Sequence, residues 1–135
     1  MKIIVFEGLD GSGKSTLKKE VDKITNYKYV CMDRFTGSTL IYDEYTQRQN
    51  RKSEIYKLEK ELSDNIFMIY CYCSTSTTKK RLKEKKDELT IKNAIIQAPI
   101  FEEYLKQTPY KFVRINTDKP INTCVKKVVE AIKKW

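Results

Sequence analysis

Short apolar runs alternate with longer amphipathic segments along the whole chain. Four runs have the continuous apolar character of strands buried on both faces, and they lie at residues 3–6, 29–32, 66–73 and 112–115. The segments between them repeat apolar residues at spacings of three and four, which is typical of helices with one buried face. We therefore expect helices over 15–25, within 40–63, over 75–88, around 91–98 and over 121–132.

Two places interrupt this pattern. Residues 46–53 are wholly polar, and we expect a loop or an exposed turn there. Pro99 lies within a helical repeat, and because proline has no backbone N–H, we expect it to kink or split that helix. Strands that alternate with helices favour βαβ units and a parallel sheet covered on both faces. The pattern predicts a three-layer α/β fold with a mainly parallel sheet of about four strands, in one domain over residues 1–135.

The composition is that of a soluble globular chain, with 40% hydrophobic and 33% charged residues. No stretch reaches the roughly 18 apolar residues of a membrane span, and the first residues lack the pattern of a signal peptide. Four cysteines occur without a CxxC pair and there is no histidine, so a common zinc set is excluded. We expect a cytoplasmic protein with reduced thiols and no membrane contact.

The net charge is strongly positive, because 27 Lys and Arg residues stand against 18 Asp and Glu residues, which gives +9. Such an excess indicates an anionic partner, either nucleic acid or a small phosphorylated substrate. A general lysine bias on exposed helix surfaces explains the charge equally well. Charge alone does not decide between these alternatives.

A glycine-rich loop follows the first apolar run. Residues Gly8 to Ser15 fit the pattern GxxxxGK[ST], and three of the chain's four glycines lie within it. The strand before the loop and the helix after it suit phosphate binding, because backbone N–H groups and the helix N-terminus then face the ligand. Lys14 offers a charge to the β- and γ-phosphates, and the Ser15 hydroxyl offers a ligand to Mg²⁺. The pattern predicts ATP with Mg²⁺, bound by Gly8, Asp10, Gly11, Ser12, Gly13, Lys14, Ser15 and Thr16.

Two charged residues, Asp33 and Arg34, come directly after the second apolar run. In parallel sheets the carboxyl ends of the strands gather around the ligand, so we expect this pair beside the phosphate loop. Asp33 is a candidate ligand of Mg²⁺ through water, and Arg34 is a candidate for gripping a phosphate with its planar fork. The alternative is a surface ion pair at a strand end.

The segment FEGLDGSGKSTL, from Phe6 to Leu17, resembles the opening of the thymidylate kinase family and its deoxynucleoside kinase relatives. The resemblance implies a P-loop kinase fold. Asp33-Arg34-Phe35 is similar to the family's DR[YFH] element. That likeness implies that Asp33 serves the metal site and that Arg34 contacts the phosphate of the acceptor.

A very basic segment at residues 79–88 follows the third apolar run. It resembles the family's lid, so we expect a short lid at about residues 76–90. Mobile cations that close over the migrating phosphoryl group stabilise its charge. Arg81 matches the first arginine of the lid and is our candidate for the transition-state cation, with Lys85 or Lys86 at the second position. The alternative is a solvated helix face.

One unit of the family is absent. Thymidylate kinases insert a strand and a helix between the first helix and the DR strand, and that unit carries part of the acceptor site. Here the first helix ends near Asn26 and the strand follows at once. The residues left to build an acceptor pocket are Arg34, Tyr42, Tyr45 and Arg48.

Three functions remain open. The first is transfer of the γ-phosphoryl group of ATP to a (deoxy)nucleoside monophosphate, most simply one like dTMP. The second is transfer to a hydroxyl of a deoxynucleoside or of a polynucleotide 5′ end, which needs a base such as Glu7, Asp10 or Asp33. The third is nucleotide binding without turnover. A small nucleotide is the favoured partner and nucleic acid the less favoured one, and monomer and homodimer remain equal alternatives.

Overall fold

The structure is a computed structural model, and it describes residues 2–46, 50–84 and 88–135. Strands and helices alternate through these residues, as the sequence pattern predicts. In chain order they are β1 (Ile3–Glu7), α1 (Lys14–Ile24), β2 (Val30–Asp33), α2 (Thr36–Thr46), α3 (Lys52–Leu62), β3 (Ile66–Tyr72), α4 (Thr75–Lys83), α5 (Glu88–Gln107), β4 (Lys111–Asn116) and α6 (Ile121–Lys134). Among the described residues, none of the helices is long and apolar enough to cross a membrane.

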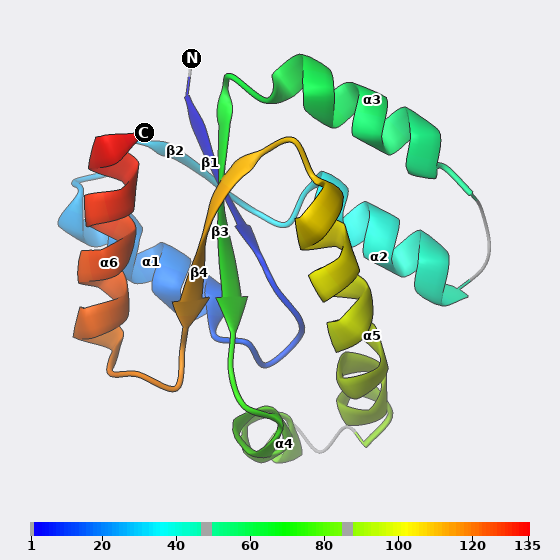
Figure 1. Cartoon of the computed structure of the whole chain (residues 1–135). Helices are drawn as coiled ribbons and strands as arrows, with labels where there is room; N and C mark the ends of the chain where they lie inside the picture. The colour runs from blue at the N-terminus through cyan, green and yellow to red at the C-terminus, as the bar shows by residue number, and fades with distance from the viewer. Residues whose placement is uncertain (1, 47–49, 85–87) are drawn as a thin grey trace.

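The four strands form one parallel sheet in the order β2-β1-β3-β4. Helices α1 and α6 cover one face, and α2 and α5 cover the other, with α3 beyond α2 (Figure 1). This arrangement confirms the three-layer α/β prediction with four strands. Because all strands run the same way, their carboxyl ends meet at one edge of the sheet, and that edge carries the phosphate loop.

Alternation along β3 explains how one strand serves two cores. Phe67, Ile69 and Cys71 face α1 and α6, whereas Met68 and Tyr70 face α2 and α5. Both sets are buried, so the strand is apolar without interruption, as expected for a central strand in a three-layer fold. The two cores fix the sheet between its helices and thereby fix the edge where the strands end.

The connection from α1 to β2 is a tight turn. Asn26 and Tyr27 adopt left-handed backbone angles there, with φ of 52° and 56°. The turn leads straight into β2, which pairs with β1 on one side and forms the outer strand of the described sheet. Val30 at the start of β2 is 54% exposed as a result. The direct link predicted from the sequence is therefore present.

The prediction for Pro99 is wrong in one respect, because α5 continues unbroken through it. The ring removes one helical hydrogen bond, which costs about 3 kcal/mol in a helix interior. Burial of Phe101, Tyr104 and Leu105 in the core against the sheet supplies the compensating energy. The other boundaries shift by a few residues: α2 begins at Thr36, and β2 ends at Asp33. Of the polar stretch at 46–53, residues 47–49 lie outside the described residues, Thr46 ends α2, and Lys52 and Ser53 begin α3.

Candidate functional site

The phosphate loop joins β1 to α1 and passes close to the end of β3. Gly8 has φ of 151°, and a Cβ atom there would lie 2.5 Å from the carbonyl oxygen of Cys71, so only glycine fits. Ser12 is 3% exposed, and its N–H donates to the carbonyl of Leu9 at 3.1 Å. The Thr117 hydroxyl, from the turn after β4, donates to the carbonyl of Ser12. The loop is thus tied to two neighbouring strands before any ligand binds.

Lys14 is the first residue of α1 and is only 6% exposed. Burial lowers the pKa of its ammonium group, and the nearby Arg34 lowers it further, while Asp33 and Asp10 act in the opposite direction. Among the described residues its ammonium forms no ion pair within 4 Å. A buried cation without a contacting anion is costly, so the position suits a bound anion.

Ser15 and Asp33 meet beside Lys14. The Ser15 hydroxyl donates to Oδ2 of Asp33 at 2.7 Å. Parallel pairing of β1 with β2 places Asp33 opposite Phe6, which brings the end of β2 to the loop. Both side chains offer exposed oxygen atoms, the ligands that Mg²⁺ prefers, and Mg²⁺ is commonly held by one or two protein groups together with phosphates and water. The two residues therefore fit a magnesium ion.

Arg34 adopts a left-handed backbone conformation with φ of 69°, which is uncommon for a residue other than glycine. Its N–H donates to the carbonyl of Phe6 at 2.9 Å. Its guanidinium group donates to the carboxylate of Asp10 and, at 3.4 Å, to the hydroxyl of Ser38. Asp33 thus pairs with Ser15 and Arg34 with Asp10, so the two residues contact different parts of the phosphate loop.

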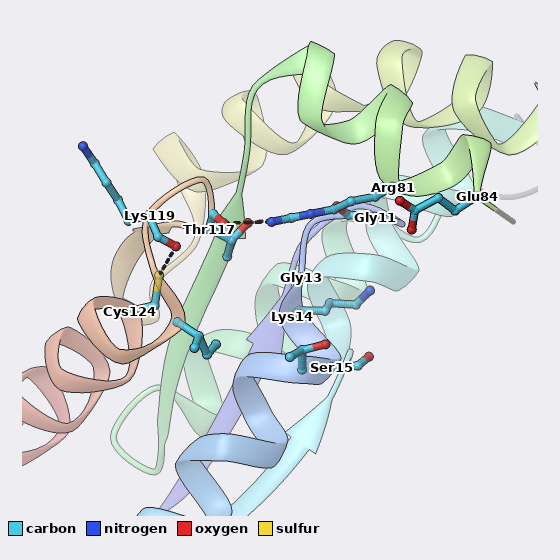
Figure 2. Close-up of a pocket in the computed structure, with 11 residues that line it drawn as sticks. Gly11, Gly13, Lys14, Ser15, Arg81, Glu84, Thr117, Lys119 and Cys124 are labelled. Atoms are coloured by element: carbon cyan, nitrogen blue, oxygen red, sulfur yellow. Dashed lines mark hydrogen bonds between the residues drawn. The ribbon is translucent and has the colours of Figure 1, made fainter.

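The Arg81 guanidinium lies behind the loop. It donates to the carbonyl of Gly11 at 3.1 Å, to the Thr117 hydroxyl at 3.0 Å and to the Thr117 carbonyl at 2.8 Å (Figure 2). All three acceptors are neutral. Hydrogen bonds lower the pKa of the nearby Asp118 carboxyl group, and the positive charge of the guanidinium helps to lower it. The candidates Lys85 and Lys86 lie outside the described residues, as does the middle of the expected lid.

A cavity of about 480 Å³ opens between the loop, α4 and the start of α6 (Figure 2). The loop side of its wall contains Lys14, Ser15 and the exposed Thr16. Sequence reasoning missed the opposite side, formed by Thr117, Lys119 and Ile121. The position of Thr117 directly after the last strand was the available signal, since strand ends gather at one edge.

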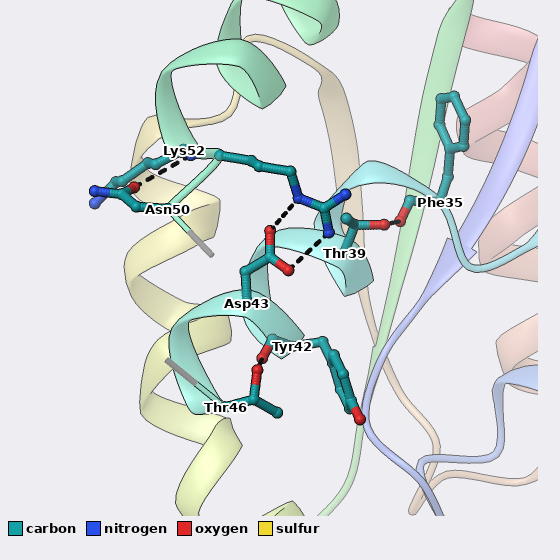
Figure 3. A network of polar contacts seen from close by, with 8 residues as sticks. Phe35, Thr39, Tyr42, Asp43, Thr46, Asn50 and Lys52 are labelled. Atoms are coloured by element: carbon teal, nitrogen blue, oxygen red, sulfur yellow. Dashed lines mark hydrogen bonds and ion pairs between the residues drawn. The ribbon is translucent and has the colours of Figure 1, made fainter. Parts of the chain in front are cut away.

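A second cavity of about 500 Å³ lies beside Arg34. Its lining consists of Arg34, Phe35, Ser38, Thr39, Tyr42, Asp43 and Arg51. Arg51, which sequence reasoning also missed, donates to both carboxylate oxygens of Asp43 at 2.8 and 2.7 Å (Figure 3). Tyr42 is 53% exposed beside this pair. Of the other expected pocket residues, Tyr45 donates instead to Asn93 of α5, and Arg48 lies outside the described residues.

Glu7 is fully buried at the end of β1. Its carboxylate accepts from the N–H of Phe35 and from the Ser38 hydroxyl at 2.8 Å. Burial raises the pKa of this carboxyl group to about 6, against hydrogen bonds that lower it. Because its own chain encloses both oxygens, Glu7 is poorly placed to take a proton from a substrate. The side chain of Asp10, by contrast, is 58% exposed.

Comparison with protein-family models finds no matching family, and comparison with curated proteins finds no match. Solved structures do match. The YorR protein from Bacillus subtilis, in complex with phosphorylated GDP, superposes with a TM-score of 0.77 at 17% identity, over 98% of this chain and 96% of that one. Deoxyadenosine kinase from M. mycoides with bound dCTP superposes with a TM-score of 0.69 at 14% identity, over the whole of both chains. The chain therefore has the three-layer α/β fold of these P-loop proteins.

Proposed function

We propose that this protein transfers the γ-phosphoryl group of ATP to a nucleoside monophosphate, with a dTMP-like acceptor as the first candidate. The observation that carries the proposal is the ammonium group of Lys14, a largely buried residue in the lining of the first cavity, which lacks an ion-pair partner among the described residues and lies beside the Ser15–Asp33 pair. The nucleotides bound in the two similar structures support a nucleotide ligand.

The donor fits the cavity between the loop and α6. Its phosphates would follow the loop to Lys14, and its base would lie toward Ile121 and Thr117. Ser15 and Asp33 would hold Mg²⁺, which when bound neutralises charge on the phosphates. Arg81 would stay near the loop and add positive charge as the phosphoryl group moves.

The acceptor fits the second cavity, with its phosphate at Arg34 and its base near Tyr42. A phosphate acceptor is already anionic and needs no general base. The enclosure of Glu7 is consistent with this chemistry, because it leaves that carboxylate without access to a substrate hydroxyl. Arg34 next to Asp10 would then bind the acceptor phosphate at the loop.

A hydroxyl acceptor is the second candidate, favoured by one observation. Asp10 has an exposed carboxylate on the loop, beside Arg34, where it could accept a proton from a nucleoside hydroxyl. A similar fold in a deoxyadenosine kinase fits this alternative. The two candidates differ in acceptor class, so a direct assay separates them.

The test is transfer from labelled ATP·Mg²⁺ to deoxynucleoside monophosphates, deoxynucleosides and 5′-hydroxyl oligonucleotides. We expect product from monophosphates alone. Lys14→Ala should abolish transfer, whereas Lys19→Ala, an exposed lysine on the same helix, should leave it unchanged. Labelling of a hydroxyl acceptor alone would favour Asp10 as base, and nucleotide binding without any transfer would contradict the proposal.

A further inference from the structure

A second buried carboxylate, Glu59 of α3, lies outside both cavities. It is 0% exposed, although glutamate is rarely buried without partners. Its Oε1 accepts from the hydroxyls of Thr36, at 2.9 Å, and of Tyr104, and its Oε2 accepts from the hydroxyl of Thr108 at 2.9 Å. Three hydroxyl donors, one from the start of α2 and two from α5 and the residue after it, therefore surround one carboxylate.

These hydroxyls connect α3 to two other parts of the chain. Thr36 is the first residue of α2, Tyr104 belongs to α5, and Thr108 follows the end of α5. Since α5 packs on the sheet through Tyr104, Glu59 connects the start of α2 to a rigid part of the core. The Thr36 oxygen also lies 3.1 Å from the hydroxyl of Tyr110, the residue directly before β4.

The start of α2 is the segment that carries Arg34. On one side β1 holds it, because Phe6 accepts from the N–H of Arg34, and Glu7 accepts from Phe35 and Ser38. On the other side Glu59 holds it through Thr36. Two buried carboxylates, from β1 and α3, thus fix the five residues from 34 to 38 on opposite sides.

This double attachment has a physical reason in the backbone of Arg34. A left-handed conformation for a residue other than glycine is strained and persists only where the surroundings fix it. Gly37 allows the close packing, since a Cβ atom there would lie 2.8 Å from Oε2 of Glu7 and 2.8 Å from the Tyr104 ring. Without fixed neighbours the segment would relax and the guanidinium would leave Asp10.

We infer that Glu59 is a positioning residue for Arg34 and acts through the hydroxyl of Thr36. The role of Arg34 in holding the acceptor rests on the function proposed above. The positioning itself rests only on the contacts of Glu59, Thr36 and the backbone. The acceptor therefore depends on a carboxylate that it never touches.

The test compares two valine substitutions on the same carboxylate. Thr36→Val removes the hydroxyl that links Glu59 to α2, whereas Thr108→Val removes a hydroxyl that links it only to the end of α5. Both variants lose one hydrogen bond to a carboxylate and keep a β-branched shape. Each hydroxyl also contacts Tyr110, that of Thr36 at the Tyr110 hydroxyl and that of Thr108 at the Tyr110 N–H, and Thr36 is buried whereas Thr108 is half-buried, so the two variants are compared at matched global stability. Glu59→Gln, of the same size as glutamate, completes the set.

For Thr36→Val we expect the KM for the monophosphate acceptor to rise roughly tenfold, the scale of one hydrogen bond to a charged group, with the KM for ATP unchanged. Thr108→Val should change neither KM. Glu59→Gln should fall between them, because its remaining carbonyl oxygen still accepts from Thr36. Equal effects of both valine variants on the acceptor KM would overturn the inference.

A second measurement does not depend on activity. Amide hydrogen exchange of Arg34 and Phe35 reports whether their hydrogen bonds to Phe6 and Glu7 stay closed. Exchange at these two amides should accelerate at least several-fold in Thr36→Val relative to Thr108→Val at matched global stability. If exchange responds and no transfer is seen with any acceptor, the positioning holds and the proposed function fails. If exchange is the same in both variants, Glu59 serves the core alone.

Discussion

Ligand binding and burial have opposite requirements for the charge of Lys14. Ligand binding needs its charge at the start of α1, but burial without an anion disfavours that charge, as its lowered pKa reflects. We predict that Lys14→Met abolishes ATP binding and, in the nucleotide-free protein, raises the melting temperature by about 2–5 °C because a buried charge is removed. Calorimetry with and without ATP·Mg²⁺ measures both effects. A lower melting temperature would show that the ammonium group already has a stabilising partner.

Glu7 gives a pH-dependent prediction. Folding raises its pKa from 4.5 to about 6, so the folded protein binds more protons than the unfolded chain between these values. The free energy of unfolding contributed by Glu7 is therefore full below pH 4.5 and falls as pH rises through 6, by about 2 kcal/mol. Glu7→Gln should reduce the decline by this amount in urea unfolding measured from pH 4.5 to 6.5, while Glu59, whose pKa is also raised by burial, still contributes. Glu61→Gln, on the exposed side of α3, should leave the decline intact.

Single residues were predictable where the signal is local. The phosphate loop is contiguous in sequence, and its residue types follow from close backbone approach to phosphates, so its position could be read directly. Thr117, Arg51 and Glu59 join the site or its support only through pairings between distant segments. The position of Thr117 after a strand indicates the edge of the sheet but not its partners, and a glutamate within a charged helix carries no local mark of such contacts. The partners of Arg34 and Arg81 were hidden for the same reason.

At the scale of elements, the apolar pattern predicted the strands well because buried parallel strands are apolar without interruption. The first and last residues of the helices were harder to predict from the sequence. The start of α2 at Thr36 lies in a polar segment and is held by Glu7 and Glu59, which sequence periodicity does not report. The continuity of α5 through Pro99 depends on packing energy, which competes with local propensity and here exceeds it.

Pro99 therefore allows a test of the balance between packing energy and local helix propensity in α5. Pro99→Ala restores an N–H that can donate to the carbonyl of Ile95 in α5. We expect the free energy of unfolding to rise by about 1–2 kcal/mol, since the regained helical bond exceeds the entropy that proline removes from the unfolded chain. Pro109→Ala lies between α5 and β4, gains no helical bond, and should not stabilise. Urea unfolding of both variants measures this. An unchanged free energy of unfolding for Pro99→Ala would contradict the prediction and show that α5 already compensates for the hydrogen bond missing at Pro99.

For the whole molecule, the parallel sheet brings every strand end to one edge, and cations outnumber anions in the lining of the cavity there. Lys14, Arg81 and Lys119 belong to that lining, together with the carboxylate of Glu84. A positive rim raises the local concentration of a small polyanion such as a nucleotide and speeds its association. This distribution explains part of the +9 charge without a nucleic-acid substrate.

The same charge predicts weak, non-specific binding of single-stranded oligonucleotides. Such binding depends on release of counterions, so its affinity should fall steeply between 50 and 200 mM salt, with a slope of about −0.7 for each phosphate contacted. Transfer to deoxynucleoside monophosphates, which depends on buried groups at the loop, should decline far less over this range. Fluorescence anisotropy of a labelled oligonucleotide and transfer assays at matched salt measure the two responses. Tight oligonucleotide binding that persists at 200 mM salt, together with labelling of its 5′ hydroxyl, would identify a polynucleotide as the acceptor instead.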